Sequence, residues 1–140
     1  METKNPGIFI EKIFLLKSSF EMVNPMGEQV YNLHLNNYFI KPVDDTSQTG
    51  KSLKMYEFSF DIMYKVENPL FNFFCDFAVI YSREDDAMMT WEEFSDSHAL
   101  AHVIPYLREY VSNMTNRLPV PVLILPPINT ASLLQNCGEA

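Results

Sequence analysis

Residues 97–127, SHALAHVIPYLREYVSNMTNRLPVPVLILPP, decide the C-terminal half of the fold. Pro105 interrupts an otherwise helical pattern, so we expect it to kink a helix from about His98 to Arg117 or to end an N-terminal turn. Four prolines follow between residues 118 and 127. That density excludes a regular helix, and this segment is predicted to cross the molecule as an extended chain. The helical pattern is an apolar stripe at spacings of three, one, three, four and three residues, formed by Leu100, Val103, Ile104, Leu107, Val111 and Met114.

The residues before this stretch alternate between apolar and polar side chains, which is typical of β-strands. Four such runs cover residues 8–22, 30–40, 53–66 and 70–81. Because only short turns separate them, apart from a polar loop at 41–52, we predict one antiparallel meander. Residues 82–96 are predicted to form a loop with a short helical turn.

Two helix starts are predicted from capping residues. Ser97 is expected to cap the long helix, and Asn129 or Thr130 a short last helix that ends at Leu134. The prediction is an α+β fold in a single domain, residues 1–140. It has a four-stranded antiparallel sheet, a long helix, an extended crossover loop and a short C-terminal helix.

Composition narrows the function. The chain has 18 acidic and 10 basic residues and a formal net charge of −8, which argues against binding a phosphate backbone. It is too apolar, at 47%, for a disordered acidic chain. Its 11 Phe, 7 Tyr and 8 Met are an unusual surplus of large and adaptable side chains.

Other sequence features indicate a protein of the cytoplasm. Cys75 and Cys137 form neither a CxxC pair nor a disulfide framework, and Cys75 is predicted to be a buried thiol. No apolar run approaches the length of a membrane span, so no direct membrane insertion is expected. The N-terminal residues lack the pattern of a signal peptide.

A resemblance to the SecB family of protein-export chaperones is carried by three runs: residues 104–109 (IPYLRE), 113–117 (NMTNR) and 121–129 (PVLILPPIN). The family typically shows F-P-Y-A-R-E, a polar helix end with a Met, and P-x-L-x-L-x-P-V-N. Weaker similarity lies upstream, at residues 13–14, 19–21, 56–57 and 73–76.

The resemblance implies the same order of elements as the periodicity does. It further implies a homotetramer, built as a dimer of dimers, whose long helices pack at the interface between dimers. It implies an ATP-independent holdase that keeps unfolded precursor polypeptides in hydrophobic grooves and delivers them to the translocase ATPase SecA. Such a protein is not an enzyme and needs no catalytic group, metal or cofactor.

Some residues depart from the family pattern. The acidic surface that contacts SecA maps to Glu21, Phe74 and Asp76, but Lys17 stands where a further acid is expected. The second helix looks short at Ala140, where the family often has a longer helix and an acidic tail. The alternative is therefore a dedicated SecB-like chaperone of an antitoxin in a toxin–antitoxin system.

Two sets of apolar residues are candidates for binding. The long-helix stripe, Leu100 to Met114, is the candidate oligomer interface implied by the resemblance. The client-binding groove is predicted from aromatic residues and from the proline-rich crossover, which buries poorly; packing in the core or tetramer is the alternative for each. The groove candidates are Tyr38, Phe39, Trp91, Phe94, Leu118, Val120, Val122, Leu123 and Leu125.

Two further motifs have weaker functional interpretations. His98 and His102 lie four residues apart, as two metal ligands on a helix would, but Ala99 occupies the position of the acid in HExxH. They are interpreted as solvent-exposed helix residues. The acidic residues 84–86 and 92–93 could act as paired acids in a hydrolase, but a solvated acidic loop is the preferred interpretation.

Overall fold

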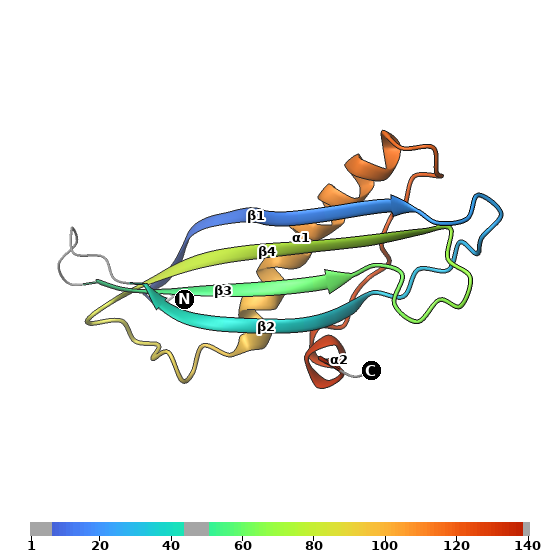
Figure 1. Cartoon of the computed structure of the whole chain (residues 1–140). Helices are drawn as coiled ribbons and strands as arrows, with labels where there is room; N and C mark the ends of the chain where they lie inside the picture. The colour runs from blue at the N-terminus through green and yellow to red at the C-terminus, as the bar shows by residue number, and fades with distance from the viewer. Residues whose placement is uncertain (1–6, 44–50, 139–140) are drawn as a thin grey trace.

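The computed structural model describes residues 7–43 and 51–138. Four strands precede two helices in the chain (Figure 1). The elements are β1 (Ile8–Met22), β2 (His34–Val43), β3 (Lys51–Asp61), β4 (Phe71–Glu84), α1 (Asp96–Asn116) and α2 (Thr130–Gln135). The predicted α+β fold, with its extended crossover between the two helices, is confirmed.

The strands form one antiparallel sheet in the order β1-β4-β3-β2. The predicted simple meander is therefore wrong for β1, which pairs with β4 rather than with β2. The alternation within a strand predicts its two faces but carries no information about its partner. β2, β3 and β4 follow one another as antiparallel neighbours, and β1 lies beside β4. This is a Greek-key arrangement.

The predicted strand boundaries agree with the structure to different degrees. The prediction for β1 matches its bounds, whereas β2 starts at His34 rather than at residue 30. In the predicted loop at 41–52, residues 41–43 belong to β2 and residues 51–52 to β3, while residues 44–50 lie outside the described part. β3 ends at Asp61, earlier than predicted, because its last residues turn to start the β3–β4 connection.

One face of the sheet is covered by α1, which crosses the strands diagonally (Figure 1). The side chains between them are mostly aromatic, because alternate positions of β3 and β4 carry rings. Tyr56, Phe58, Phe60, Phe71, Phe73 and Tyr81 are all fully or almost fully buried. Much of the aromatic surplus is therefore used in the core of the chain itself.

The start of α1 differs from the prediction by two residues. Ser95, not Ser97, is the N-cap, and its hydroxyl accepts a hydrogen bond from the His98 amide at 3.4 Å. The Ser97 hydroxyl instead lies 3.0 Å from that of Thr130 and ties the start of α1 to α2. The helix continues through Pro105, so this proline does not end an N-terminal turn; packing of the buried stripe on both sides holds the helix together.

The apolar stripe of α1 faces the sheet of its own chain. Leu100, Val103, Ile104, Leu107 and Val111 are buried there, and Met114 is partly buried. Leu100, Val103, Leu107 and Val111 have no exposed surface and Ile104 is 6% exposed, so this stripe packs within its own chain, and a role for it at an oligomer interface stays a prediction. The sheet needs an apolar cover, and the helix that follows it provides one.

The short helix α2 ends the described chain close to β2 (Figure 1). Asn129 caps it, with its side-chain oxygen accepting a hydrogen bond from the Ser132 amide at 3.1 Å. The predicted start is confirmed, and the helix ends at Gln135, one residue later than predicted. None of the described helices has the length and apolarity needed to cross a membrane.

Candidate functional site

The crossover between α1 and α2 has two different sides. Leu123 and Leu125 are only 3% exposed and belong to the core, whereas Val122 is 48% and Ile124 73% exposed. An extended chain points successive side chains in opposite directions, so the core takes alternate residues. The crossover therefore keeps an apolar outer side, which Val122 and Ile124 form.

Two residues of α1 fix the crossover in this register. The buried Thr115 hydroxyl accepts a hydrogen bond from the Leu123 amide at 2.9 Å. The Arg108 guanidinium donates to the carbonyl oxygens of Leu125 at 3.3 Å and Pro126 at 3.2 Å. Arg108 of the IPYLRE motif thus binds the PVLILPPIN motif, which explains why the two occur together in this chain.

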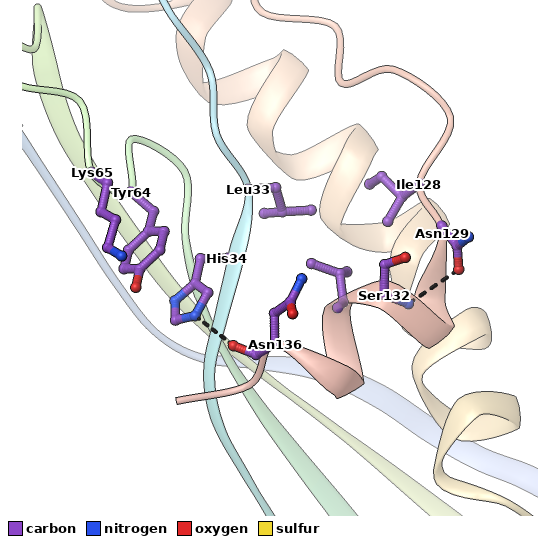
Figure 2. A pocket seen from close by; sticks show the side chains of 9 residues that line it. Leu33, His34, Tyr64, Lys65, Ile128, Asn129, Ser132 and Asn136 are labelled. Carbon is purple, nitrogen blue, oxygen red and sulfur yellow. Dashed lines mark hydrogen bonds between the residues drawn. The ribbon is translucent and has the colours of Figure 1, made fainter. Parts of the chain in front are cut away.

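A pocket of about 360 Å³ lies where the crossover meets α2 (Figure 2). We call it the α2 pocket. Its walls come from the chain before and at the start of β2, from the segment after β3, from the end of the crossover and from α2. The lining residues are Leu33, His34, Tyr64, Lys65, Ile128, Asn129, Ser132, Leu133 and Asn136.

An aromatic pair forms one wall of the α2 pocket. The rings of His34 and Tyr64 stack with centroids 3.7 Å apart. His34 Nε2 lies 3.0 Å from the carbonyl oxygen of Asn136, and Nδ1 lies 3.0 Å from Asn36 Oδ1. Because a carbonyl oxygen only accepts, the contact with Asn136 is a hydrogen bond in the tautomer that has its proton on Nε2. The Gly138 amide adds a second tie, to the carbonyl oxygen of Leu35 at 3.2 Å.

Lys65 is the lysine that stands at the mouth of this pocket. Its φ of 54° lies in the left-handed region, which costs a residue with a Cβ about 1 kcal/mol or more. Its Nζ lies 5.4 Å from the centroid of the Tyr64 ring. At the end of β3, desolvation raises the pKa of Asp61, and the Met63 amide and His34 partly offset this.

None of the nine predicted groove residues lines the α2 pocket. Trp91 and Phe94 lie just before the start of α1 and make other contacts: the Trp91 ring donates to the Ser52 hydroxyl at 3.0 Å, and Phe94 packs on Tyr81. The Tyr38 hydroxyl donates to Asp96 Oδ2 at 2.9 Å.

The remaining groove candidates are also separated in space. Phe39 is 49% exposed on an edge strand and points to the opposite face of the sheet from Tyr38. Leu118 and Val120 are half-buried at the start of the crossover. Sequence reasoning missed His34, Tyr64 and Lys65. No local sequence pattern reveals that these residues line one pocket together with α2.

The three candidates for SecA contact share the sheet face that faces away from α1. Glu21 is exposed, and Phe74 is 41% exposed one row away. Asp76 and Lys17 are register partners on β4 and β1 and line a second cavity of about 210 Å³. Opposite charges in adjacent positions offset one another, so Lys17 reduces the acidic character of this surface.

His98 and His102 are exposed on α1, as interpreted from the sequence, and line a third cavity of about 260 Å³ with Ile8, Met89 and Phe94. His102 Nδ1 lies 2.7 Å from the Tyr81 hydroxyl, and desolvation, followed by the nearby His98, lowers the pKa of His102. Within residues 7–43 and 51–138, no three His, Cys, Asp or Glu side chains come close enough to hold a metal ion.

Known structures resemble this arrangement over most of its length. The Mycobacterium tuberculosis SecB-like chaperone Rv1957, in complex with a ChAD peptide from the Rv1956 HigA1 antitoxin, aligns with a TM-score of 0.60 and 21% identity. The alignment covers 87% of this chain and 91% of that one. A protein of unknown function from Streptococcus agalactiae aligns with a TM-score of 0.56 and 13% identity, covering 86% of this chain and 97% of that one.

Sequence comparison gives a shorter match. The uncharacterized protein MJ0357 of Methanocaldococcus jannaschii is 33% identical over 55 residues, which are 39% of this chain and 36% of that protein. The match thus spans about a third of its length. No family model matches the chain. The structural similarity establishes the class of fold: this chain has a SecB-like fold, as the sequence motifs predicted.

Proposed function

We propose that this protein is an ATP-independent chaperone that binds non-native polypeptide segments. The main observation in support is the outer side of the crossover, where Val122 and Ile124 are exposed and the α2 pocket of about 360 Å³ lies at the end of the crossover. Exposed apolar side chains next to a pocket suit segments that a folded protein would bury. The SecB-like fold and the antitoxin peptide bound to Rv1957 support this function. The net charge of −8 keeps a loaded complex soluble.

The test is suppression of aggregation of a reduced, unfolded client without nucleotide. The double variant Val122→Ser, Ile124→Ser removes apolar surface from the outer side and is expected to weaken client binding several-fold. Met88→Ser, at a site 62% exposed in the loop between β4 and α1, is the matched control and is expected to bind normally. Wild-type binding by the folded double variant would overturn this assignment of the surface.

A dedicated chaperone of one antitoxin is the second candidate, and two observations favour it. The structural neighbour Rv1957 was solved with an antitoxin peptide. Lys17 is also the register partner of Asp76 on the surface where SecA contact was predicted. Affinity purification from the native host separates the two functions: one dominant small protein favours antitoxin binding, whereas many precursor polypeptides favour export.

Delivery to SecA is the export form of the proposal, with Glu21, Phe74 and Asp76 as the contact surface. Lys17→Glu places an acid at the position where the family pattern has one, and it is expected to tighten SecA binding. Phe74→Ala is expected to abolish it without loss of client binding. Equal SecA affinity of wild type and both variants would exclude this surface.

We further propose a cytoplasmic homotetramer, a dimer of dimers. The surfaces available for it are the outer side of α1, where Tyr106 is exposed, and the edge strand β1, where Ile10, Leu15 and Leu16 are exposed. Light scattering after gel filtration gives the mass of the assembly. Leu15→Asp is expected to reduce it, and a wild-type mass for this variant together with Tyr106→Asp would exclude both surfaces.

A further inference from the structure

We propose that the α2 pocket selects client segments in which a large apolar side chain lies next to a carboxylate. This inference rests on the proposed function and names the substrate class of one of its sites. The opposite preference, for basic segments, would follow from the net charge of −8 alone. In this proposal the positive charge at the pocket, and not the negative charge of the whole chain, sets the preference for client segments.

The pocket has an apolar floor and one charged residue. Leu33, Ile128 and Leu133 supply the apolar contacts, and Lys65 is the only Lys, Arg, Asp or Glu among the nine lining residues. His34 is the other basic side chain there, and both of its ring nitrogens are engaged with Asn36 and Asn136. An ionic contact with a client segment in this pocket is therefore made through Lys65.

Lys65 is held at the mouth of the pocket in two ways. Its backbone has a φ of 54°, and its Nζ lies 5.4 Å from the Tyr64 ring centroid. Figure 2 shows the side chain running along the Tyr64 ring, with Tyr64 and His34 between it and Leu33, so Lys65 lines the outer edge of the pocket. Asn or Gly would adopt this backbone at lower cost, which makes the lysine at this position a candidate for a functional role.

Asn136 supplies a polar contact for the backbone of the bound segment. In Figure 2 its side-chain amide points from the end of α2 into the space between Leu33 and Ser132. The backbone carbonyl oxygen of Asn136 lies 3.0 Å from His34 Nε2, and this contact holds the end of α2 in place. An amide can donate to and accept from an extended peptide, while an apolar side chain fills the floor and a neighbouring carboxylate meets Lys65.

The test uses short fluorescent peptides with one Phe followed by Glu, Gln or Lys, all with blocked ends. A fourth peptide ends in Phe with a free carboxylate, which distinguishes a chain terminus from an acidic side chain as the source. We expect wild type to bind the Glu peptide three- to tenfold more tightly than the Lys peptide. The difference should shrink in high salt, because added ions screen exposed charges.

Variants of Lys65 test the assignment directly. Lys65→Gln is expected to remove the preference and Lys65→Glu to reverse it, while circular dichroism reports that both fold. Lys51→Glu changes the net charge equally at the other end of β3, about 35 Å away for a strand of this length, and should keep the wild-type preference.

The possible failures are distinguishable. An unchanged Glu-to-Lys ratio in Lys65→Glu, or its loss in Lys51→Glu, would overturn the role of Lys65. Suppression of client aggregation by wild type without binding of any of the four peptides would also overturn it, but would leave the chaperone function standing. Loss of both activities in wild type would overturn both.

Discussion

Thr115 offers the sharpest test of how the crossover is held, through the isosteric change Thr115→Val. Its side chain is fully buried, and its hydroxyl accepts from the Leu123 amide at 2.9 Å while donating to the carbonyl of Val111 at 2.8 Å. Val111 keeps its helical amide partner when the hydroxyl is lost. The Leu123 amide has no such substitute and is left buried without an acceptor.

The expected cost follows from that one unsatisfied group. An unpaired buried amide costs about 1–3 kcal/mol, while valine and threonine have similar shape and similar helix propensity. We therefore expect Thr115→Val to lower the free energy of unfolding by about 1–3 kcal/mol in urea titrations. Thr115→Ser is the matched control, because it keeps the hydroxyl and loses one methyl group, at about 1 kcal/mol.

Hydrogen exchange separates the two variants where their stabilities overlap. The Leu123 amide should lose protection in Thr115→Val and keep it in Thr115→Ser. If Thr115→Val has wild-type stability within about 0.5 kcal/mol and retains protection at Leu123, this hydrogen bond does not hold the crossover.

Three other expectations concern titratable and nucleophilic groups. Burial, with a smaller contribution from Asp76, raises the pKa of the Cys75 thiol to about 12, so iodoacetamide should modify Cys137 first and reach Cys75 only on unfolding; equal rates would contradict its burial. His34→Phe keeps an aromatic ring but loses the bond to α2, worth about 0.5–1.5 kcal/mol, so labelling of Cys137 should speed up about two- to tenfold if α2 detaches. Desolvation is the main cause that raises the pKa of Asp61 in the folded protein above its ordinary value of 3.8. Ionising Asp61 therefore destabilises the fold, and the stability that its protonated form contributes is lost as the pH rises through the raised pKa. The variant Asp61→Asn should therefore gain more over wild type at pH 7 than at pH 3, and an equal gain at both would refute this.

The elements with strong local patterns were predictable from sequence. β1 matches its predicted bounds, and α2 starts at Thr130 after the predicted cap. The stripe of α1 was also located correctly, but the sequence did not show that the sheet of the same chain covers it. Leu100 and Leu107 pack on the sheet of the same chain, because an amphipathic face shows that a surface is buried without showing what covers it.

The candidate site was less predictable, because its residues meet only in three dimensions. The crossover was correctly identified as an apolar extended segment, yet the division between buried Leu123 and exposed Ile124 needed the structure. Alternation alone gives two sides, and only the position of the core decides which side is open.

By itself, the sequence determined the type and order of the elements, the proline-rich crossover and the SecB-like motifs, since each is a local pattern of side-chain period or backbone restriction. The tertiary structure decided the pairing of β1 with β4, the assembly of His34, Tyr64 and Lys65 into one pocket, and the contact of Lys17 with the surface around Asp76. The surplus of aromatic residues was visible from composition, but its use in the core was not. These features join residues distant in the chain, and their distances depend on how the whole chain packs.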